Sequence, residues 1–99
     1  MLITNTAGPF AKSFAVVNEA GVHVSGLSGV ETAVLQSLNK EIPEVDYNDI
    51  SKNDGWEDVY SDGSLVEATV SNNVFSITSG GFYRFKVAAG TGISIGITK

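Results

Sequence analysis

Alternation of apolar and polar residues with a period of two dominates the second half of the chain. From Trp56 onward, short apolar runs are separated by turn residues, first Asp62-Gly63 and later Asn72-Asn73. An Asp-Gly pair favours a two-residue hairpin turn, because both of its central positions require a positive φ. This pattern predicts a C-terminal meander of five strands. The strands are expected over residues 56–60, 65–70, 74–78, 82–87 and 92–97.

The first half of the chain is less regular. Residues 13–17 favour a strand and residues 22–27 alternate with period two, with turn residues between them, so we expect a hairpin. Residues 1–12 are expected to form an N-terminal arm. Residues 30–39 are ambiguous, because their apolar positions fit one helix face or a strand that is buried on both faces. The spacing alone slightly favours a helix there.

These patterns predict one all-β domain over residues 1–99, a small antiparallel β-sandwich or partly open barrel. The chain of 99 residues is 42% hydrophobic, which is typical of a single globular domain. Strands at this spacing, with turn signals between them, are typical of sandwiches and barrels. In the strand over residues 82–87, Arg84 and Lys86 are expected to face outward, toward an acidic loop. The residues expected in the core are Trp56, Ile77, Tyr83, Phe85 and Ile95.

The acidic residues gather in one segment of the chain. The formal net charge is −5, and eight of the 11 acidic residues lie between Glu41 and Asp62. We expect residues 40–55 to be a long acidic loop that is mobile and dispensable for folding, since loop length affects stability only weakly. A negative field repels phosphate groups. Neither nucleic acid nor an anionic membrane is therefore expected as a partner.

Residues that could support catalysis or bind a metal ion are few and isolated. The chain has no cysteine and a single histidine, His23, so it cannot form a zinc site of the usual composition. The segment starting at Asp49 resembles a calcium loop, but Gly55 falls at its seventh position instead of the sixth. There is also no nucleophile elbow or P-loop. We expect no enzymatic activity, no cofactor and no metal site.

A series of motifs in the second half resembles a pattern found in small virion proteins of tailed bacteriophages. The motifs are Trp56-Glu57-Asp58-Val59, Asp62-Gly63-Ser64-Leu65-Val66, Asn72-Asn73-Val74-Phe75-Ser76-Ile77 and Gly80-Gly81-Phe82-Tyr83-Arg84-Phe85. The resemblance covers about residues 30–99. It departs from the pattern at residues 40–55, where such proteins usually have a short turn. It implies a β-sandwich in which residues 30–39 are a strand. We therefore expect a strand there instead of a helix.

The resemblance also implies a function. Such proteins are non-enzymatic virion components, made in the host cytoplasm, and include head decoration (cement) proteins and head fibres. We expect a decoration protein that binds the major capsid protein across coat subunits and associates with itself, as a trimer. The expected interface comprises Met1, Leu2, Ile3, Phe10, Gly92, Ser94 and Gly96. The alternative is a tail-fibre or baseplate module that recognises a host surface glycan on a platform of Tyr47, Asn48, Asn53 and Trp56.

Overall fold

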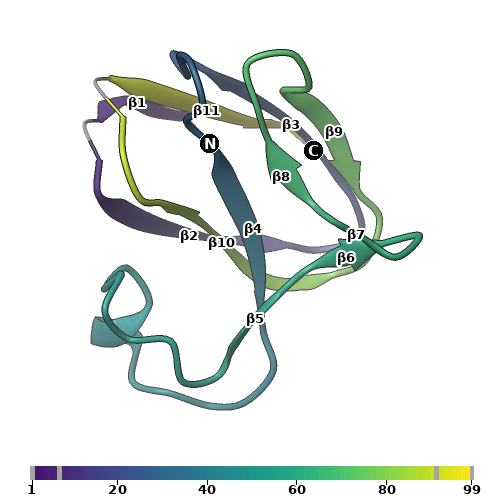
Figure 1. The fold of residues 1–99 in the computed structure, drawn as a ribbon. Helices are drawn as coiled ribbons and strands as arrows, with labels where there is room; N and C mark the ends of the chain where they lie inside the picture. The colour runs from purple at the N-terminus through teal and green to yellow at the C-terminus, as the bar shows by residue number, and fades with distance from the viewer. Residues whose placement is uncertain (1, 7, 91, 99) are drawn as a thin grey trace.

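The structure is a computed structural model that describes residues 2–6, 8–90 and 92–98. It confirms an all-β domain (Figure 1). The strands are β1 (Leu2–Thr6), β2 (Phe10–Val16), β3 (Ala20–Ser25), β4 (Ala33–Leu38), β5 (Trp56–Asp58), β6 (Tyr60–Ser61), β7 (Ser64–Leu65), β8 (Glu67–Ala68), β9 (Val74–Ile77), β10 (Gly81–Val87) and β11 (Ile93–Thr98). Within the described residues, the helical structure is limited to one 3-10 turn, η1 (Glu44–Asp46).

Two antiparallel sheets form the body of the domain. We name each sheet after its central strand. The β11 sheet has the order β1-β11-β3-β9, and the β10 sheet has the order β2-β10-β4-β5, with β8 also paired to β4. The sheets lie face to face as two layers (Figure 1). Because each sheet ends at separate edge strands, the domain is an open sandwich and the sheets do not close into a barrel.

The order of the strands differs from the predicted meander and hairpin. The strands β9, β10 and β11 follow one another in the chain but alternate between the two sheets, and so do β2 and β3. The five-strand meander and the hairpin over residues 13–27 are therefore wrong. A period-two pattern shows which side chains face the core, but it does not show which strand is the hydrogen-bonded neighbour. The Asp62-Gly63 turn does join a hairpin, β6–β7, and both turn residues have a positive φ.

The N-terminal residues are built into the sheets. Backbone pairing joins Ile3 to Ile95, which places β1 at the edge of the β11 sheet, and β2 pairs along its whole length with β10. The expectation of an N-terminal arm is therefore wrong for the described residues. At the turn between β1 and β2, Gly8 donates its N–H to the carbonyl of Gly90, 3.0 Å away. A Cβ atom on Gly8 would lie only 2.9 Å from the Gly90 nitrogen, so this approach requires glycine.

The ambiguous segment over residues 30–39 contains a strand, as the resemblance implied. Strand β4 lies inside the β10 sheet, between β10 on one side and β5 and β8 on the other. Its inward residues Ala33 and Leu35 belong to the core, and its outward residue Gln36 is also buried. A strand covered on both faces loses the alternation of apolar and polar residues. This explains why the spacing of apolar residues alone slightly favoured a helix.

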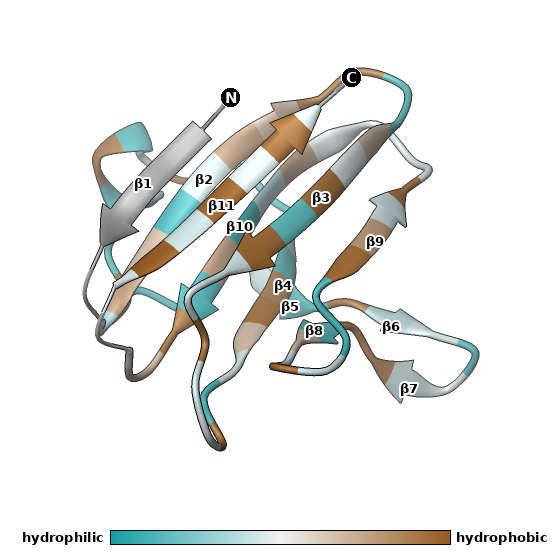
Figure 2. Cartoon of the chain, turned by 90° about the horizontal axis from the view of Figure 1, so that it is seen from above, coloured by the Kyte–Doolittle hydropathy of each residue, from teal (hydrophilic) through white to brown (hydrophobic). Residues whose placement is uncertain are grey.

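The core fills the space between the inner faces of the sheets. Tyr83 and Phe85 point inward from β10, as predicted, and so does Val87. Phe14 stacks on Phe85 with ring centroids 5.7 Å apart. Figure 2 shows the matching alternation of hydropathy along β11. Its three isoleucines, which include Ile95, are buried in the same cluster together with Ile77. The core residues predicted on these strands are therefore confirmed.

Candidate functional site

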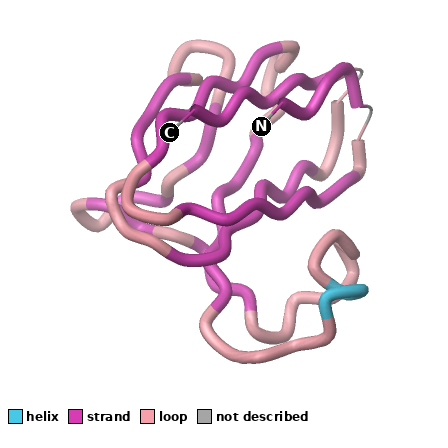
Figure 3. Tube along the Cα trace, turned by 180° about the vertical axis from the view of Figure 1, so that it is seen from behind, coloured by secondary structure: helices cyan, strands magenta, loops and turns pink. Residues whose placement is uncertain are grey.

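A second, smaller cluster forms on the outer face of the β10 sheet, around Arg84. Arg84 points outward from β10, yet its exposed fraction is 0% because the loop over residues 40–55 folds over it. Figure 3 shows this loop and its 3-10 turn turned back beneath the sandwich. Arg84 was predicted to face outward toward the acidic loop, and the structure confirms this direction. The Arg84 side chain is nevertheless shielded from solvent by the loop.

The guanidinium group of Arg84 is surrounded by uncharged oxygen atoms. Its Nε donates to Oε1 of Gln36 at 2.8 Å, and its Nη1 donates to the carbonyls of Tyr47 and Asp49 at 3.3 and 3.1 Å. Its Nη2 donates to the carbonyl of Lys52 at 3.1 Å and to Oδ1 of Asn53 at 3.4 Å. A guanidinium offers five N–H donors in a fixed plane. The loop supplies four of the acceptors and Gln36 of β4 supplies the fifth, so oxygen atoms enclose the group as they would a bound cation.

The base of the loop is closed by local contacts. Asn39 donates its N–H to the Gly55 carbonyl at 2.8 Å, and the exposed Lys40 and Asp54 form an ion pair of 2.7 Å. Gly55 has a φ of 86°, and a Cβ atom there would lie 2.9 Å from the Ile42 side chain. Glycine is therefore required both for the backbone conformation and for the close approach.

The charges at this cluster influence each other. Burial lowers the pKa of Arg84, and the nearby carboxylate of Asp49 partly opposes that shift. Arginine nevertheless stays protonated in proteins, so the dipoles of the surrounding carbonyl groups stabilise its buried charge. The pKa of Asp49 is lowered because the hydroxyl and the N–H of Ser51 donate to its Oδ1, at 2.6 and 3.0 Å. These contacts weigh against a mobile, dispensable loop.

Trp56 belongs to this outer cluster. Its exposed fraction is 6%, so its predicted burial is confirmed, but it lies outside the cluster that holds Tyr83 and Phe85. The Arg84 guanidinium carbon lies 4.7 Å from the centroid of the Trp56 ring, within cation–π range. Tyr47 packs edge-on against Trp56 at 5.8 Å between ring centroids. The Trp56 side chain therefore points outward from β5 and lies under the loop.

The predicted ligand platform of Tyr47, Asn48, Asn53 and Trp56 comes together in this loop, but its residues serve structural contacts. Oδ1 of Asn48 accepts the N–H of Ser13 on β2 at 2.7 Å. Oδ1 of Asn53 accepts from both basic side chains of β10, and Trp56 is buried. These residues hold the loop on the sheet. They do not form an open stacking surface.

The predicted interface residues have different surroundings. Ser94 and Gly96 lie on the outer face of the β11 sheet, and Gly92 directly precedes β11. Phe10 instead packs partly buried against the core. The backbones of Leu2 and Ile3 pair with β11, and Met1 lies outside the described residues. On the outer face of the β11 sheet, the described residues of β3, β9 and β11 are the small Gly21, Ser25, Ser76, Ser94, Gly96 and Thr98 and the larger His23 and Val74.

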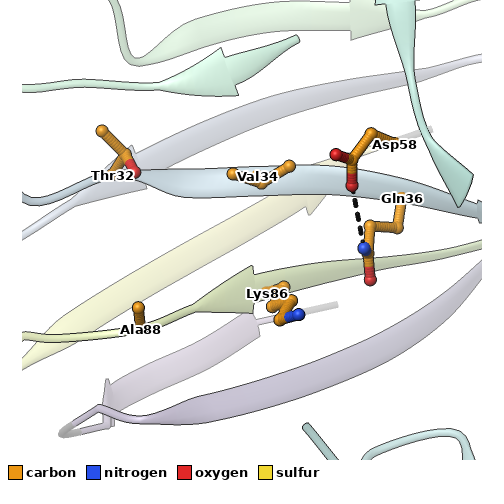
Figure 4. A pocket seen from close by; sticks show the side chains of 6 residues that line it. All are labelled: Thr32, Val34, Gln36, Asp58, Lys86 and Ala88. Carbon is orange, nitrogen blue, oxygen red and sulfur yellow. Dashed lines mark hydrogen bonds between the residues drawn. The ribbon is translucent and has the colours of Figure 1, made fainter. Parts of the chain in front are cut away.

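A hollow of about 200 Å³ lies on the outer face of the β10 sheet, beside the loop. Figure 4 shows Asp58 and Gln36 at one end, Thr32 and Ala88 at the other, and Val34 and Lys86 between them. Nε2 of Gln36 donates to Oδ1 of Asp58 at 2.9 Å. Nζ of Lys86 donates to Oδ1 of Asn53 at 2.9 Å. This hollow adjoins the Arg84 cluster, because Gln36 belongs to both.

Two further features of the described residues concern metal ligands and membrane-spanning helices. No group of three or more His, Cys, Asp or Glu side chains among them is placed to hold a metal ion. His23, the one histidine, is exposed on the outer face of the β11 sheet. In the part of the chain that the structure describes, no helix has the length and apolar content needed to cross a bilayer.

Comparison with known proteins gives no further assignment. No protein-family model, curated protein or solved structure matches this chain. Sequence reasoning missed the roles of Gln36 and Asp58. The available signal was Arg84 itself, an outward arginine in a strand of large core residues, together with a long loop that carries five acidic residues and two bases.

Proposed function

We propose that this chain is a non-enzymatic structural protein of a phage virion, a decoration (cement) protein that stabilises the head by binding across coat subunits. The proposal rests first on the motif series from Trp56 to Phe85, which resembles small virion proteins. The structural observation that carries it is the outer face of the β11 sheet. No loop lies over that face in Figure 2, and its central strands carry Ser25, Ser94 and Gly96 beside the exposed His23.

A surface of this kind suits binding to a repeating protein lattice. Small side chains allow the backbones of two proteins to approach closely, and they lose little side-chain entropy when they are covered. A protein that binds the assembled shell and not the free subunits stabilises the shell by mass action. The acidic residues of the loop lie on the opposite side, where they stay in solvent or meet a basic patch that adds specificity.

Self-association strengthens such binding. A ring of identical subunits places several copies of the same face on neighbouring coat subunits, and each further contact forms at a high effective concentration. A trimer matches the threefold axes of a capsid. We therefore propose the major capsid protein and further copies of this chain as partners, with the virion as the site of action.

The test is to mix the purified chain with phage heads that lack it, and to measure co-sedimentation and the temperature of head disruption. We expect saturable binding at a fixed ratio to the coat subunits and a higher disruption temperature. Sedimentation equilibrium of the chain alone should give three times the monomer mass. Heads that neither bind the chain nor gain thermal stability would contradict the proposal.

A further inference from the structure

We propose that the hollow beside the loop is a saccharide-binding site that takes one sugar ring of a glycan. The hollow lies on the β10 sheet, on the side of the sandwich away from the outer face of the β11 sheet. The inference therefore goes beyond the proposed lattice binding and does not depend on it. Its basis is the set of polar groups around the hollow and the way in which the Arg84 cluster fixes one of them.

The strand register sets the chemistry of the hollow. Across the sheet, Gln36 on β4 lies between Arg84 on β10 and Asp58 on β5. Two residues earlier on β4, Val34 lies directly opposite Lys86. The hollow thus has a carboxylate at one end, an ammonium group along one side and a small apolar floor. These groups lie on paired strands, which are more rigid supports than loops.

The carboxylate of Asp58 is held in place by the buried arginine. Because Nε of Arg84 donates to Oε1 of Gln36, the amide of Gln36 must direct its Nε2 toward Asp58. That amide then donates to Oδ1 of Asp58, and the exposed carboxylate keeps Oδ2 as an acceptor for a ligand. A fixed acceptor costs less entropy on binding than a freely rotating one.

The ammonium group of Lys86 provides the donors. Its Nζ is anchored to Oδ1 of Asn53 at 2.9 Å, and an ammonium group has three N–H donors. Two of them remain for a ligand. The side chains of Val34, beside Lys86, and of Ala88, at the end of the hollow away from Asp58, present methyl groups (Figure 4). An apolar floor with a few fixed polar groups is the general composition of a small-molecule site.

The mixture of charges selects the class of ligand. An anion is attracted by Lys86 but repelled by Asp58 and by the net charge of −5, and a cation is repelled by Lys86. A neutral polyol meets neither penalty, because each hydroxyl can donate to the carboxylate or accept from the ammonium group. The carbon-bound hydrogens of a sugar ring fit the methyl floor. A sugar ring therefore satisfies the whole site.

The size of the hollow limits the ligand to one ring and the affinity to weak binding. Sites for drug-sized ligands occupy about 300–1,000 Å³, and this hollow is about 200 Å³. A single ring in an open site binds with a Kd on the order of millimolar. Weak sites become effective when many copies act together, as they would on an array of identical subunits.

The experiment is an NMR titration of the full chain with glucose, galactose, mannose and N-acetylglucosamine, one at a time. We expect one of these sugars to shift the signals of Val34, Lys86 and Ala88 with a saturable, millimolar dependence, while the signals of Gly96 stay unchanged. Asp58→Asn keeps an acceptor for Gln36 but turns the free oxygen into an N–H donor. It should weaken binding roughly tenfold, the value of one hydrogen bond to a charged group.

The matched control is Asp62→Asn, which removes the same charge at the exposed β6–β7 turn and should leave the affinity unchanged. Lys86→Met keeps the aliphatic stem and removes the donors, so it provides a second variant that should weaken binding. The proposal is wrong if none of the sugars shifts these signals. It is also wrong if both aspartate variants weaken binding equally, or if free glycine or a short arginine peptide binds the hollow more tightly than every sugar.

Discussion

The two outer faces of the sandwich obey the same alternation and yet become different surfaces. On the β11 sheet the outward residues include the small Ser94 and Gly96 and the exposed His23, and no described loop folds over them. On the β10 sheet the outward residues include Arg84 and Trp56, and the loop over residues 40–55 buries both. A residue that points away from the main core is therefore not necessarily a surface residue.

The forces that hold the two sides of the β10 sheet also differ. The inner side is held by non-directional packing around Phe85. The outer side is held by five directed hydrogen bonds from Arg84, all to uncharged oxygens, four of them on the loop. Directed bonds around one charged group fix the loop in a single conformation, while a flat uncovered face imposes no such restriction on a partner.

The largest expected effect comes from removing the centre of the outer cluster. Arg84→Ala removes a charged donor group, and hydrogen bonds that involve a charged group are worth about 1.5–3 kcal/mol each. Part of this loss is offset, because the loop carbonyls bond to water when the loop detaches. We expect the free energy of unfolding to fall by about 2–4 kcal/mol. Fluorescence of Trp56, the one tryptophan in the chain, should shift to the red as the loop opens. Urea unfolding measures the change in the free energy of unfolding.

Two controls sharpen this prediction. Arg84→Lys keeps the charge but lacks the planar fork, so it should recover only part of the lost stability. Free guanidinium at tens of millimolar is far below denaturing, molar concentrations, and it should return the Trp56 emission of Arg84→Ala toward the blue. An unchanged emission spectrum in Arg84→Ala would show that the loop does not depend on the arginine.

A smaller effect is expected from acid. The folded state lowers the pKa of Asp49 from its ordinary value of 3.8, so its contribution to stability is present above that pH and is lost as the pH falls through the lowered pKa. Asp49→Asn should remove this part of the pH dependence. The difference in unfolding free energy between wild type and variant, measured from pH 6 to pH 2.5, should shrink toward acid. If this difference in unfolding free energy grew toward acid, the stabilising role of the Asp49 carboxylate would be wrong.

Much of the fold could be predicted from single-strand patterns. The alternation in residues 82–87 correctly gave the inward positions of Tyr83 and Phe85, and Asp62-Gly63 correctly marked a hairpin turn. Strand partners could not be predicted in this way, because a turn signal marks where a strand ends and not which sheet the chain enters next. The meander and the first hairpin failed for this reason.

The outer cluster was harder to predict for a different physical reason. Charge and turn residues made residues 40–55 look like a solvated loop, but Arg84 binds this loop mainly through backbone carbonyls, which every sequence has. The pattern of side chains does not indicate which backbone carbonyls come together around the guanidinium group. The four residues of the predicted platform lie in or next to this loop, where Asn48 and Asn53 bond to the sheet.

The most direct test of the lattice-binding proposal compares one bulky charge placed on either outer face. At Gly96 an added Cβ would lie 3.9 Å from its nearest neighbour, and Ala15 is exposed on the outer face of the β10 sheet, so both sites should accept arginine without unfolding. The measurement is co-sedimentation of each variant with phage heads that lack the protein. We predict that Gly96→Arg abolishes binding and that Ala15→Arg binds like the wild type. Undiminished binding of Gly96→Arg, or loss of binding only in Ala15→Arg, would contradict the proposal that the outer face of the β11 sheet is the contact surface.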